Sequence, residues 1–220
     1  MIFATPCTTL PHRTSRIPIT HHHLSALRLH ISASFLPHDA LMLWAACTSA
    51  FFGLLRSSEY TSQTPHLHTH STLLLRHVSI APDYSRASLH LPFSKTDQFG
   101  RGATVYLTSL PSTLCPVSAL IHYLAVRSPT PGPLFLFSDG SFLTRDRLTR
   151  VLSDTFPLHS EVRTHSFRIG GATALAAAGV PEYVIRIMGR WSSDSFLRYI
   201  HVNHQAIASL QSHMVPRDPR

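Results

Sequence analysis

Five side chains spread along the sequence have the types that one reaction needs, namely Arg56, Lys95, His165, Arg168 and Tyr199. Cleaving a phosphodiester without a metal ion requires a nucleophile, cationic donors for the non-bridging oxygens and groups that move protons. Two guanidiniums can bind phosphate oxygens as forks, and an imidazole can take the nucleophile's proton. An ammonium can protonate the leaving oxygen, and a phenol can carry the phosphoryl group covalently.

The local spacing supports this chemistry only in part. His165 and Arg168 are three residues apart on an expected helix and so share a face, although a purely structural pair would look the same. Arg56 is followed three residues later by Glu59, a carboxylate that could hold the guanidinium in one orientation; its other explanation is a favourable position at a helix C-terminus. Lys95 falls in an expected turn between two strands, where an ordinary solvated lysine is the alternative.

The elements that must position these residues are mainly helical. Apolar residues at helical spacing predict a strong helix from about Asp39 to about Ser58. Further helices are expected at 116–127, 144–156, 165–178 (with Gly179 as its C-terminal cap), from Pro181, at 193–200 and at 203–214. Three β-prone segments predict a small antiparallel three-stranded sheet, at 75–80, 87–95 (with Pro92 weakening it) and 103–108. The expected fold class is therefore α+β.

Composition and charge indicate which classes of protein the chain can belong to. The 220 residues are 44% hydrophobic, enough for a core, and the formal net charge of +8 favours a polyanionic partner such as nucleic acid. Cys7, Cys47 and Cys115 form no C-x-x-C pair, so neither a disulfide framework nor a thiolate zinc site is expected. The adjacent histidines 21–23 are expected to bind no metal. No stretch reaches the roughly 18 to 20 apolar residues that span a bilayer.

Five segments in one order resemble the catalytic domain of the tyrosine recombinases, also called the phage integrase family. The order of residue types is Arg56, Lys95, His165-x-x-Arg168, Trp191 and Tyr199, and the likeness runs from about residue 41 to residue 201. Within the family the segments resemble most the eukaryotic branch of Crypton- and DIRS-type mobile elements. They read LWAACTSAFFGLLRSSE, SKTDQFGRG, LCPVSALIHYLAVRSPTPGPLFLF, HSFRIGGAT and MGRWSSDSFLRYI.

The resemblance implies a role for each residue. Arg56 and Arg168 would clamp the scissile phosphate, Lys95 would be the general acid for the 5′ oxygen, and His165 would act as an acid/base partner. Tyr199 would attack and leave a 3′-phosphotyrosine, which another 5′ hydroxyl could reverse. The resemblance also implies double-stranded DNA as substrate, no metal and no cofactor, a homo-oligomer such as a tetramer on DNA, and a nuclear location, although no targeting signal is seen.

One position near the tyrosine departs from the family pattern. The family usually places His or Trp nine residues before it; here Arg190 stands at that distance and Trp191 is eight residues away. We favour Trp191 for this position, since its indole N–H can donate to a phosphate oxygen, with Arg190 as the alternative. Plain core packing would also explain Trp191.

The resemblance divides the chain into three parts. Residues 1–35 are expected to be a poorly structured segment that could be the remnant of a core-binding domain, residues 36–202 the catalytic domain, and residues 203–220 a C-terminal helix and tail. Some 35 residues are too few for the family's helical DNA-clamping domain. The chain would then be a fragment, a decayed copy, or a partner of another polypeptide that supplies the clamp.

The expected function is DNA strand cleavage and rejoining during recombination or integration of a mobile element. Three alternatives stay open at this point. The chain could be a catalytically inactive DNA-binding relic, a domesticated interaction module that reuses the fold, or an enzyme that relaxes DNA in the manner of type IB topoisomerases.

Overall fold

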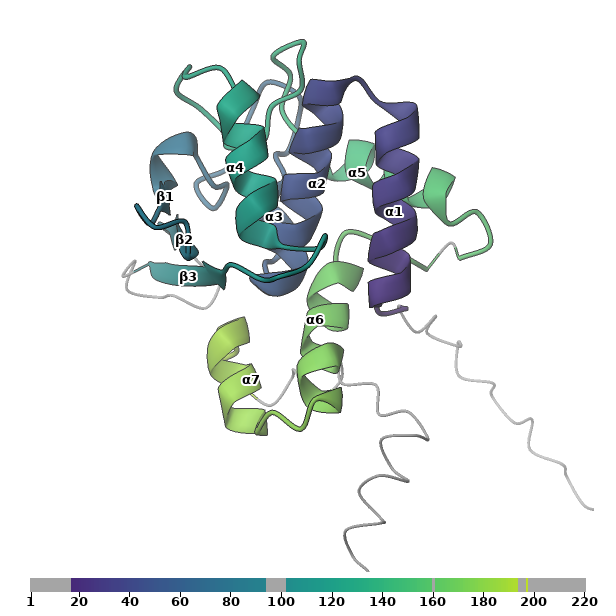
Figure 1. Ribbon diagram of the computed structural model, residues 1–220, viewed down its shortest axis with the longest axis vertical. Coiled ribbons are helices and arrows are strands. Elements are labelled where there is room, and N and C mark those ends of the chain that lie inside the picture. Colours follow the sequence, from purple (N-terminus) through teal and green to yellow (C-terminus); the bar gives the residue numbers. More distant parts are fainter. Residues whose placement is uncertain (1–16, 94–101, 160, 194–196, 198–220) are drawn as a thin grey trace, which may run out of the picture.

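The computed structural model describes residues 17–93, 102–159, 161–193 and 197. Lys95, Tyr199 and nearly all of the two helices expected after residue 192 lie outside these residues. Helices dominate the described part, and a small sheet lies to one side of them (Figure 1). The elements in chain order are α1 His21–Ser34, α2 Pro37–Phe52, α3 Ser57–Tyr60, η1 Leu75–His77, β1 Val78–Ile80, β2 Arg86–Leu91, β3 Ala103–Thr108, α4 Pro116–Val126, α5 Arg145–Thr155, α6 Ser166–Ala177 and α7 Glu182–Gly189.

Helix α2 forms the centre of the core. Every residue from Met42 to Phe51 is buried, because α1, α4 and α6 pack around the helix. A helix that is apolar on all sides belongs in a protein interior, and Pro37 at its start suits a first-turn position. Within the described ranges no helix is both long and apolar enough to cross a membrane.

The predicted end of this helix, near Ser58, is wrong by about two turns. The chain leaves the helix after Phe52, and Leu54 adopts a left-handed backbone conformation with φ of 47°. The amide of Gly53 still donates to the carbonyl of Ser49 at 2.9 Å, which closes the last turn. A separate short helix, α3, then begins after Arg56. Arg56 is therefore the N-cap residue of α3 and not the C-terminal residue of the long helix.

The expectation that residues 1–35 are poorly structured is wrong for residues 21–34. They form α1, with the Thr20 side chain accepting a hydrogen bond from the backbone of His23. Leu24, Leu27 and Ile31 are fully buried on one face of this helix. That apolar stripe packs against α2 and α5, so the helix is part of the core.

The three-stranded antiparallel sheet is confirmed, in the order β1-β2-β3. Ala87, Leu89 and Leu91 of the middle strand are buried in strict alternation, and Leu89 pairs with Val105 of β3. Strand β2 ends at Leu91, directly before Pro92, which cannot donate a backbone hydrogen bond. The sheet is thus anchored on the core by one face.

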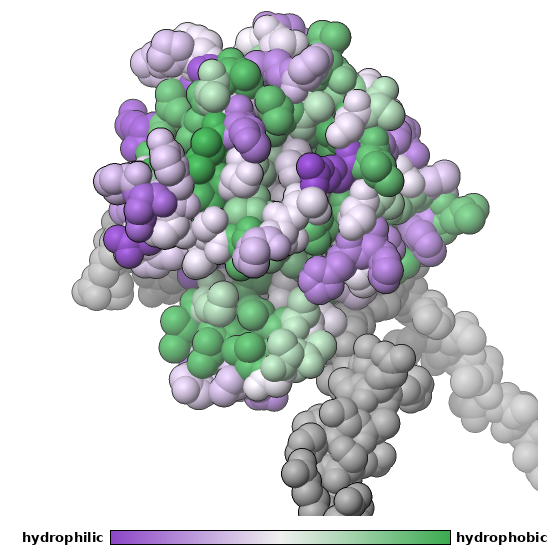
Figure 2. Space-filling view, viewed as in Figure 1, coloured by the Kyte–Doolittle hydropathy of each residue, from purple (hydrophilic) through white to green (hydrophobic). Residues whose placement is uncertain are grey.

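Helices α6 and α7 form the lower part of the molecule in Figure 1. Helix α6 ends as expected, since Gly179 adopts a positive φ of 75° just beyond it. Helix α7 buries Ile185 against α6 but leaves Ile187 and Met188 exposed. Figure 2 shows the apolar surface gathered over this lower part. Exposed apolar surface of this kind is typical of contact sites between molecules.

Two consecutive glycines let α6 approach its neighbours closely. A Cβ atom on Gly170 would lie 2.0 Å from the carbonyl oxygen of Ile19, and one on Gly171 would lie 2.4 Å from that of Phe51. The backbone of α6 therefore touches both the segment before α1 and the end of α2. This contact brings the first turn of α6, which carries Arg168, next to the turn that carries Leu54.

Replacing Gly170 tests this close approach. Alanine stabilises an ordinary helix interior relative to glycine, but here we expect Gly170→Ala to destabilise the protein by about 1–3 kcal/mol, because the added methyl meets backbone. Urea denaturation measures the change. The control is Ala177→Ser on the exposed surface of the same helix, which we expect to alter the unfolding free energy by no more than about 0.5 kcal/mol. An unchanged or raised stability of Gly170→Ala would contradict the packing.

Candidate functional site

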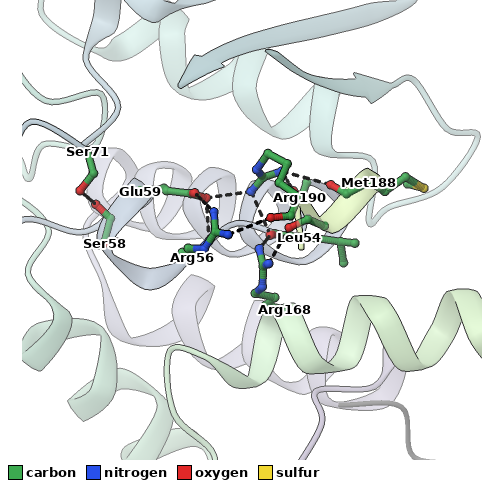
Figure 3. Close-up of polar contacts among 10 residues, drawn as sticks. Leu54, Arg56, Ser58, Glu59, Ser71, Arg168, Met188 and Arg190 are labelled. Carbon is green, nitrogen blue, oxygen red and sulfur yellow. Dashed lines mark hydrogen bonds and ion pairs between the residues drawn. The ribbon is translucent and has the colours of Figure 1, made fainter. Parts of the chain in front are cut away.

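Two guanidiniums from distant parts of the chain bind one buried carboxylate, and a third guanidinium lies close by on the carbonyl of Leu54 (Figure 3). Arg56 precedes α3, Arg168 lies in the first turn of α6, and Arg190 follows α7. They meet near Glu59 and the backbone carbonyl of Leu54. These residues span more than 130 positions of the sequence, so tertiary packing alone brings them together.

Glu59 is the centre of this arrangement, and its side chain is only 1% exposed. One carboxylate oxygen accepts a hydrogen bond from Nη1 of Arg56 at 3.0 Å. The other accepts from Nη2 of Arg190 at 2.8 Å and from the backbone amide of Arg56 at 2.7 Å. The expected pairing of Arg56 with Glu59 is confirmed. The carboxylate holds a second arginine as well, so both guanidiniums have fixed orientations.

Arg168 is almost completely buried, with 1% of its surface exposed. Its Nη1 donates to the carbonyl of Leu54 and its Nη2 to the carbonyl of Gly189. The ring of Trp191 lies over the guanidinium, 4.1 Å from its central carbon, in cation–π geometry. Backbone carbonyls of two different elements and one aromatic face therefore fix the position of this charge.

Trp191 reaches Arg168 because Gly189 carries no side chain. A Cβ atom there would lie 1.6 Å from the tryptophan ring, so no other residue fits beside it. Trp191 also packs in the small apolar cluster that joins α6 to α7. The core-packing explanation for Trp191 is thus correct in part, and the same ring covers a guanidinium of the site.

Arg190 is held by more backbone groups than its sequence position suggests. It caps α7 in a left-handed conformation, with φ of 57° and ψ of 42°, and its own carbonyl accepts from Nη2 of Arg56 at 3.0 Å. Its guanidinium donates to the carbonyls of Gly53 at 3.3 Å and Leu54 at 3.2 Å. Burial lowers the pKa of Arg190, the Glu59 charge opposes that shift, and the Arg56 charge adds to it.

Backbone strain is concentrated at this site. Leu54 and Arg190 both have positive φ angles, which cost residues with a Cβ roughly 1–2 kcal/mol each. Such strain persists where surrounding contacts over-determine the conformation, and it clusters at functional sites. Here the two strained residues supply a shared hydrogen-bond acceptor and a guanidinium to the same cluster.

The cluster is electropositive and partly open to solvent. Its four charged side chains, three guanidiniums and one carboxylate, carry two positive charges net. The side chains of Arg56 and Arg190 remain 17% and 12% exposed, whereas Arg168 and Glu59 are covered. Forked, fixed and partly accessible guanidiniums suit an anion such as a phosphate.

The other expected site residues are placed only in part. His165 is the N-cap residue of α6, half-buried and one turn before Arg168. The preceding carbonyl, of Thr164, accepts a hydrogen bond from the buried hydroxyl of Tyr60 at 2.8 Å, which anchors this entry into the helix. Lys95 and Tyr199 lie outside the described residues. The structure therefore brings together Arg56, Glu59, Arg168, Arg190 and Trp191, with His165 on the adjoining turn.

Comparison with known proteins identifies the fold. No family model matches the sequence, and no curated protein matches it. Among solved structures, the XerH site-specific recombinase bound to palindromic difH substrate matches with a TM-score of 0.64 at 15% identity, over 90% of this chain and 53% of that one. The XerA recombinase matches with a TM-score of 0.64 at 16% identity, over 93% and 67%.

The chain has the tyrosine-recombinase catalytic-domain fold. The integrase of the Tn1549 transposon, in complex with circular intermediate DNA, matches as well, with a TM-score of 0.56 at 14% identity over 92% of this chain and 67% of that one. The chain spans about half the length of XerH. The mainly helical fold with a three-stranded antiparallel sheet, as expected from the sequence, is thereby confirmed.

Replacing Glu59 tests whether its carboxylate holds the arginine cluster together. We expect Glu59→Gln to lower the free energy of unfolding by about 3 kcal/mol, because removing one member of a buried ion pair leaves the remaining charge poorly compensated. Urea denaturation measures the loss. The control Glu182→Gln, at an exposed site on α7, should change stability by less than about 0.5 kcal/mol. Equal effects of the two substitutions would show that Glu59 does not hold the cluster.

Proposed function

We propose that this chain cleaves and rejoins double-stranded DNA through a 3′-phosphotyrosine intermediate. The observation that carries the proposal is a cluster of three guanidiniums within a tyrosine-recombinase catalytic-domain fold. Arg56 and Arg190 bond the buried Glu59, and Arg168 and Arg190 share the carbonyl of Leu54. Preorganised guanidiniums of this kind stabilise the charge that develops on a pentacoordinate phosphorus. Because their orientations are fixed before substrate arrives, little reorganisation is needed during the reaction.

The proposed step exchanges one phosphoester bond for another. The phenolic oxygen of Tyr199 attacks the scissile phosphorus while its proton passes to His165, and the bond from phosphorus to the 5′ oxygen breaks. Lys95 gives its proton to that leaving oxygen. Arg56 and Arg168 bind the non-bridging oxygens; the third donor is either Trp191 or Arg190. Attack of another 5′ hydroxyl on the phosphotyrosine reverses the step.

The biological setting is proposed from the sequence resemblance and from related structures. XerH was solved bound to palindromic difH substrate, and the Tn1549 integrase was solved in complex with circular intermediate DNA. We propose that this chain also acts on DNA, in a mobile element of the Crypton or DIRS type within the nucleus. The exposed apolar face of α7, with Ile187 and Met188, supports assembly with further copies on the DNA.

One observation favours a second candidate, a DNA-binding relic without cleavage activity. The guanidinium of Arg168 is buried and donates to two backbone carbonyls, which is also what a purely structural arginine does. On this alternative the chain binds DNA through its positive charge and forms no covalent link. The two candidates differ in the formation of a phosphotyrosine.

Tyr199→Phe tests the proposed nucleophile. We expect the variant to keep the fold and DNA binding but to form no covalent adduct, because no other group replaces the phenolic oxygen. The substrate is a duplex with a nick just beyond the scissile phosphate, so that the released fragment diffuses away and the adduct accumulates on a denaturing gel. Tyr183→Phe, at an exposed position on α7, is the matched control and should react like the wild type. Adduct formation by Tyr199→Phe at the wild-type rate would contradict the mechanism.

The salt dependence of DNA binding separates both candidates from a domesticated interaction module. We expect binding of about micromolar affinity or weaker that falls steeply with salt concentration, because phosphate contacts release condensed counterions. Fluorescence anisotropy with a labelled duplex measures it between low and physiological ionic strength. Absent or salt-insensitive binding would favour the interaction module.

A further inference from the structure

We infer that Arg190, rather than Trp191, is the third donor to the scissile phosphate, and that Trp191 is a positioning residue that holds Arg168. This inference rests on the proposed function, since it names further roles at the same site. It reverses the preference that the sequence alone gave. It also changes the chemistry, because an arginine supplies a permanent charge where the family usually has His or Trp.

The geometry pairs Arg190 with Arg56. Both guanidiniums donate to the carboxylate of Glu59, at 3.0 Å from Arg56 and 2.8 Å from Arg190. Arg56 also donates to the backbone carbonyl of Arg190 at 3.0 Å. The two cations are therefore held side by side by one shared anion and one backbone link. An anion that binds the guanidinium of Arg56 therefore also lies close to the guanidinium of Arg190.

The guanidiniums of Arg56 and Arg190 are more exposed to solvent than that of Arg168. The side chains of Arg56 and Arg190 retain 17% and 12% of their surface, whereas Arg168 retains 1%. The left-handed conformation of Arg190 turns its side chain back across the end of α7 toward Gly53 and Leu54. Strained backbone conformations cluster at functional sites, and this one directs a charge into the cluster.

Trp191 has a different geometry. Its ring lies 4.1 Å over the guanidinium of Arg168 and packs against Gly189. An aromatic face in that place excludes water and restricts Arg168 to one orientation. On this inference the contribution of Trp191 comes from its aromatic ring, and the reaction does not depend on the indole N–H group. Phenylalanine keeps the ring and removes the donor, which makes it the decisive substitution.

The experiment compares two substrates, nicked duplexes with either a phosphodiester or a methylphosphonate at the scissile position. The methylphosphonate lacks the charged oxygen, so a cation that only neutralises this oxygen becomes dispensable. With the phosphodiester we expect Arg190→Ala to form adduct about 100-fold to 1000-fold more slowly than the wild type. With the methylphosphonate we expect Arg190→Ala to form adduct less than about tenfold more slowly than the wild type, because the charge that Arg190 neutralises is absent. Arg190→Lys, which keeps the charge without the fork, should fall between wild type and Arg190→Ala.

The tryptophan variants test the positioning role on the phosphodiester. We expect Trp191→Phe to react within about fivefold of the wild type and Trp191→Ala to lose about 100-fold or more, since only the latter uncovers Arg168. Equal losses in both variants would assign the donor role to Trp191 and overturn the inference. So would cleavage of the phosphodiester by Arg190→Ala within twofold of the wild type.

A binding measurement keeps the inference testable apart from cleavage. In a Tyr199→Phe background, Arg190→Ala should reduce the slope of log affinity against log salt by about 0.9, the value for one lost phosphate contact, while Trp191→Phe leaves the slope unchanged. If the wild type forms no adduct at all, the proposed cleavage fails and this slope alone decides the role of Arg190. An unchanged slope in Arg190→Ala would then overturn the inference.

Discussion

The buried carboxylate of Glu59 is the interaction on which the site depends. It accepts hydrogen bonds from the guanidiniums of Arg56 and Arg190 and from one backbone amide, and only 1% of its side chain is exposed. Without it, two neighbouring cations would repel each other in a partly buried place, where charges are poorly screened. The carboxylate compensates one of the charges and leaves a net positive site with fixed donors. That combination suits the binding of a phosphate.

The rest of the fold places Arg56 and Arg190 at that carboxylate and Arg168 beside it. The central helix α2 stops at Phe52, and the strained turn at Leu54 places Arg56 at the start of α3. The paired glycines let α6 lie directly on this turn, so that Arg168 reaches the carbonyl of Leu54. Helix α7 then returns across α6 and presents Arg190. Each approach depends on a backbone feature, either a missing Cβ atom or a left-handed residue, and these features explain why the site holds its geometry before a substrate is present.

Local patterns in the sequence predict much of this arrangement. The contacts between residues far apart in the chain do not follow from such patterns. Alternation in residues 87–91 indicated the buried strand, and the i to i+3 spacing indicated the bond between Arg56 and Glu59. The sequence did not reveal that Arg190 shares this carboxylate, because the two residues are 131 positions apart and a left-handed conformation directs the side chain. The expected end of α2 falls too late, because Leu55 lies three residues after Phe52 and so continues the helical spacing of apolar residues. The buried stripe of α1, at Leu24, Leu27 and Ile31, lies in a segment rich in polar histidines, so composition alone does not show that this segment belongs to the core.

The central claim is that this cluster is a preformed phosphate site. The most direct test is a crystal structure of the Tyr199→Phe chain bound to a nicked DNA duplex. We expect one backbone phosphate to lie within hydrogen-bond distance of the guanidiniums of Arg56 and Arg190, while Glu59 keeps its bonds to both. DNA bound to another face of the domain, with the cluster facing away from every phosphate, would contradict it.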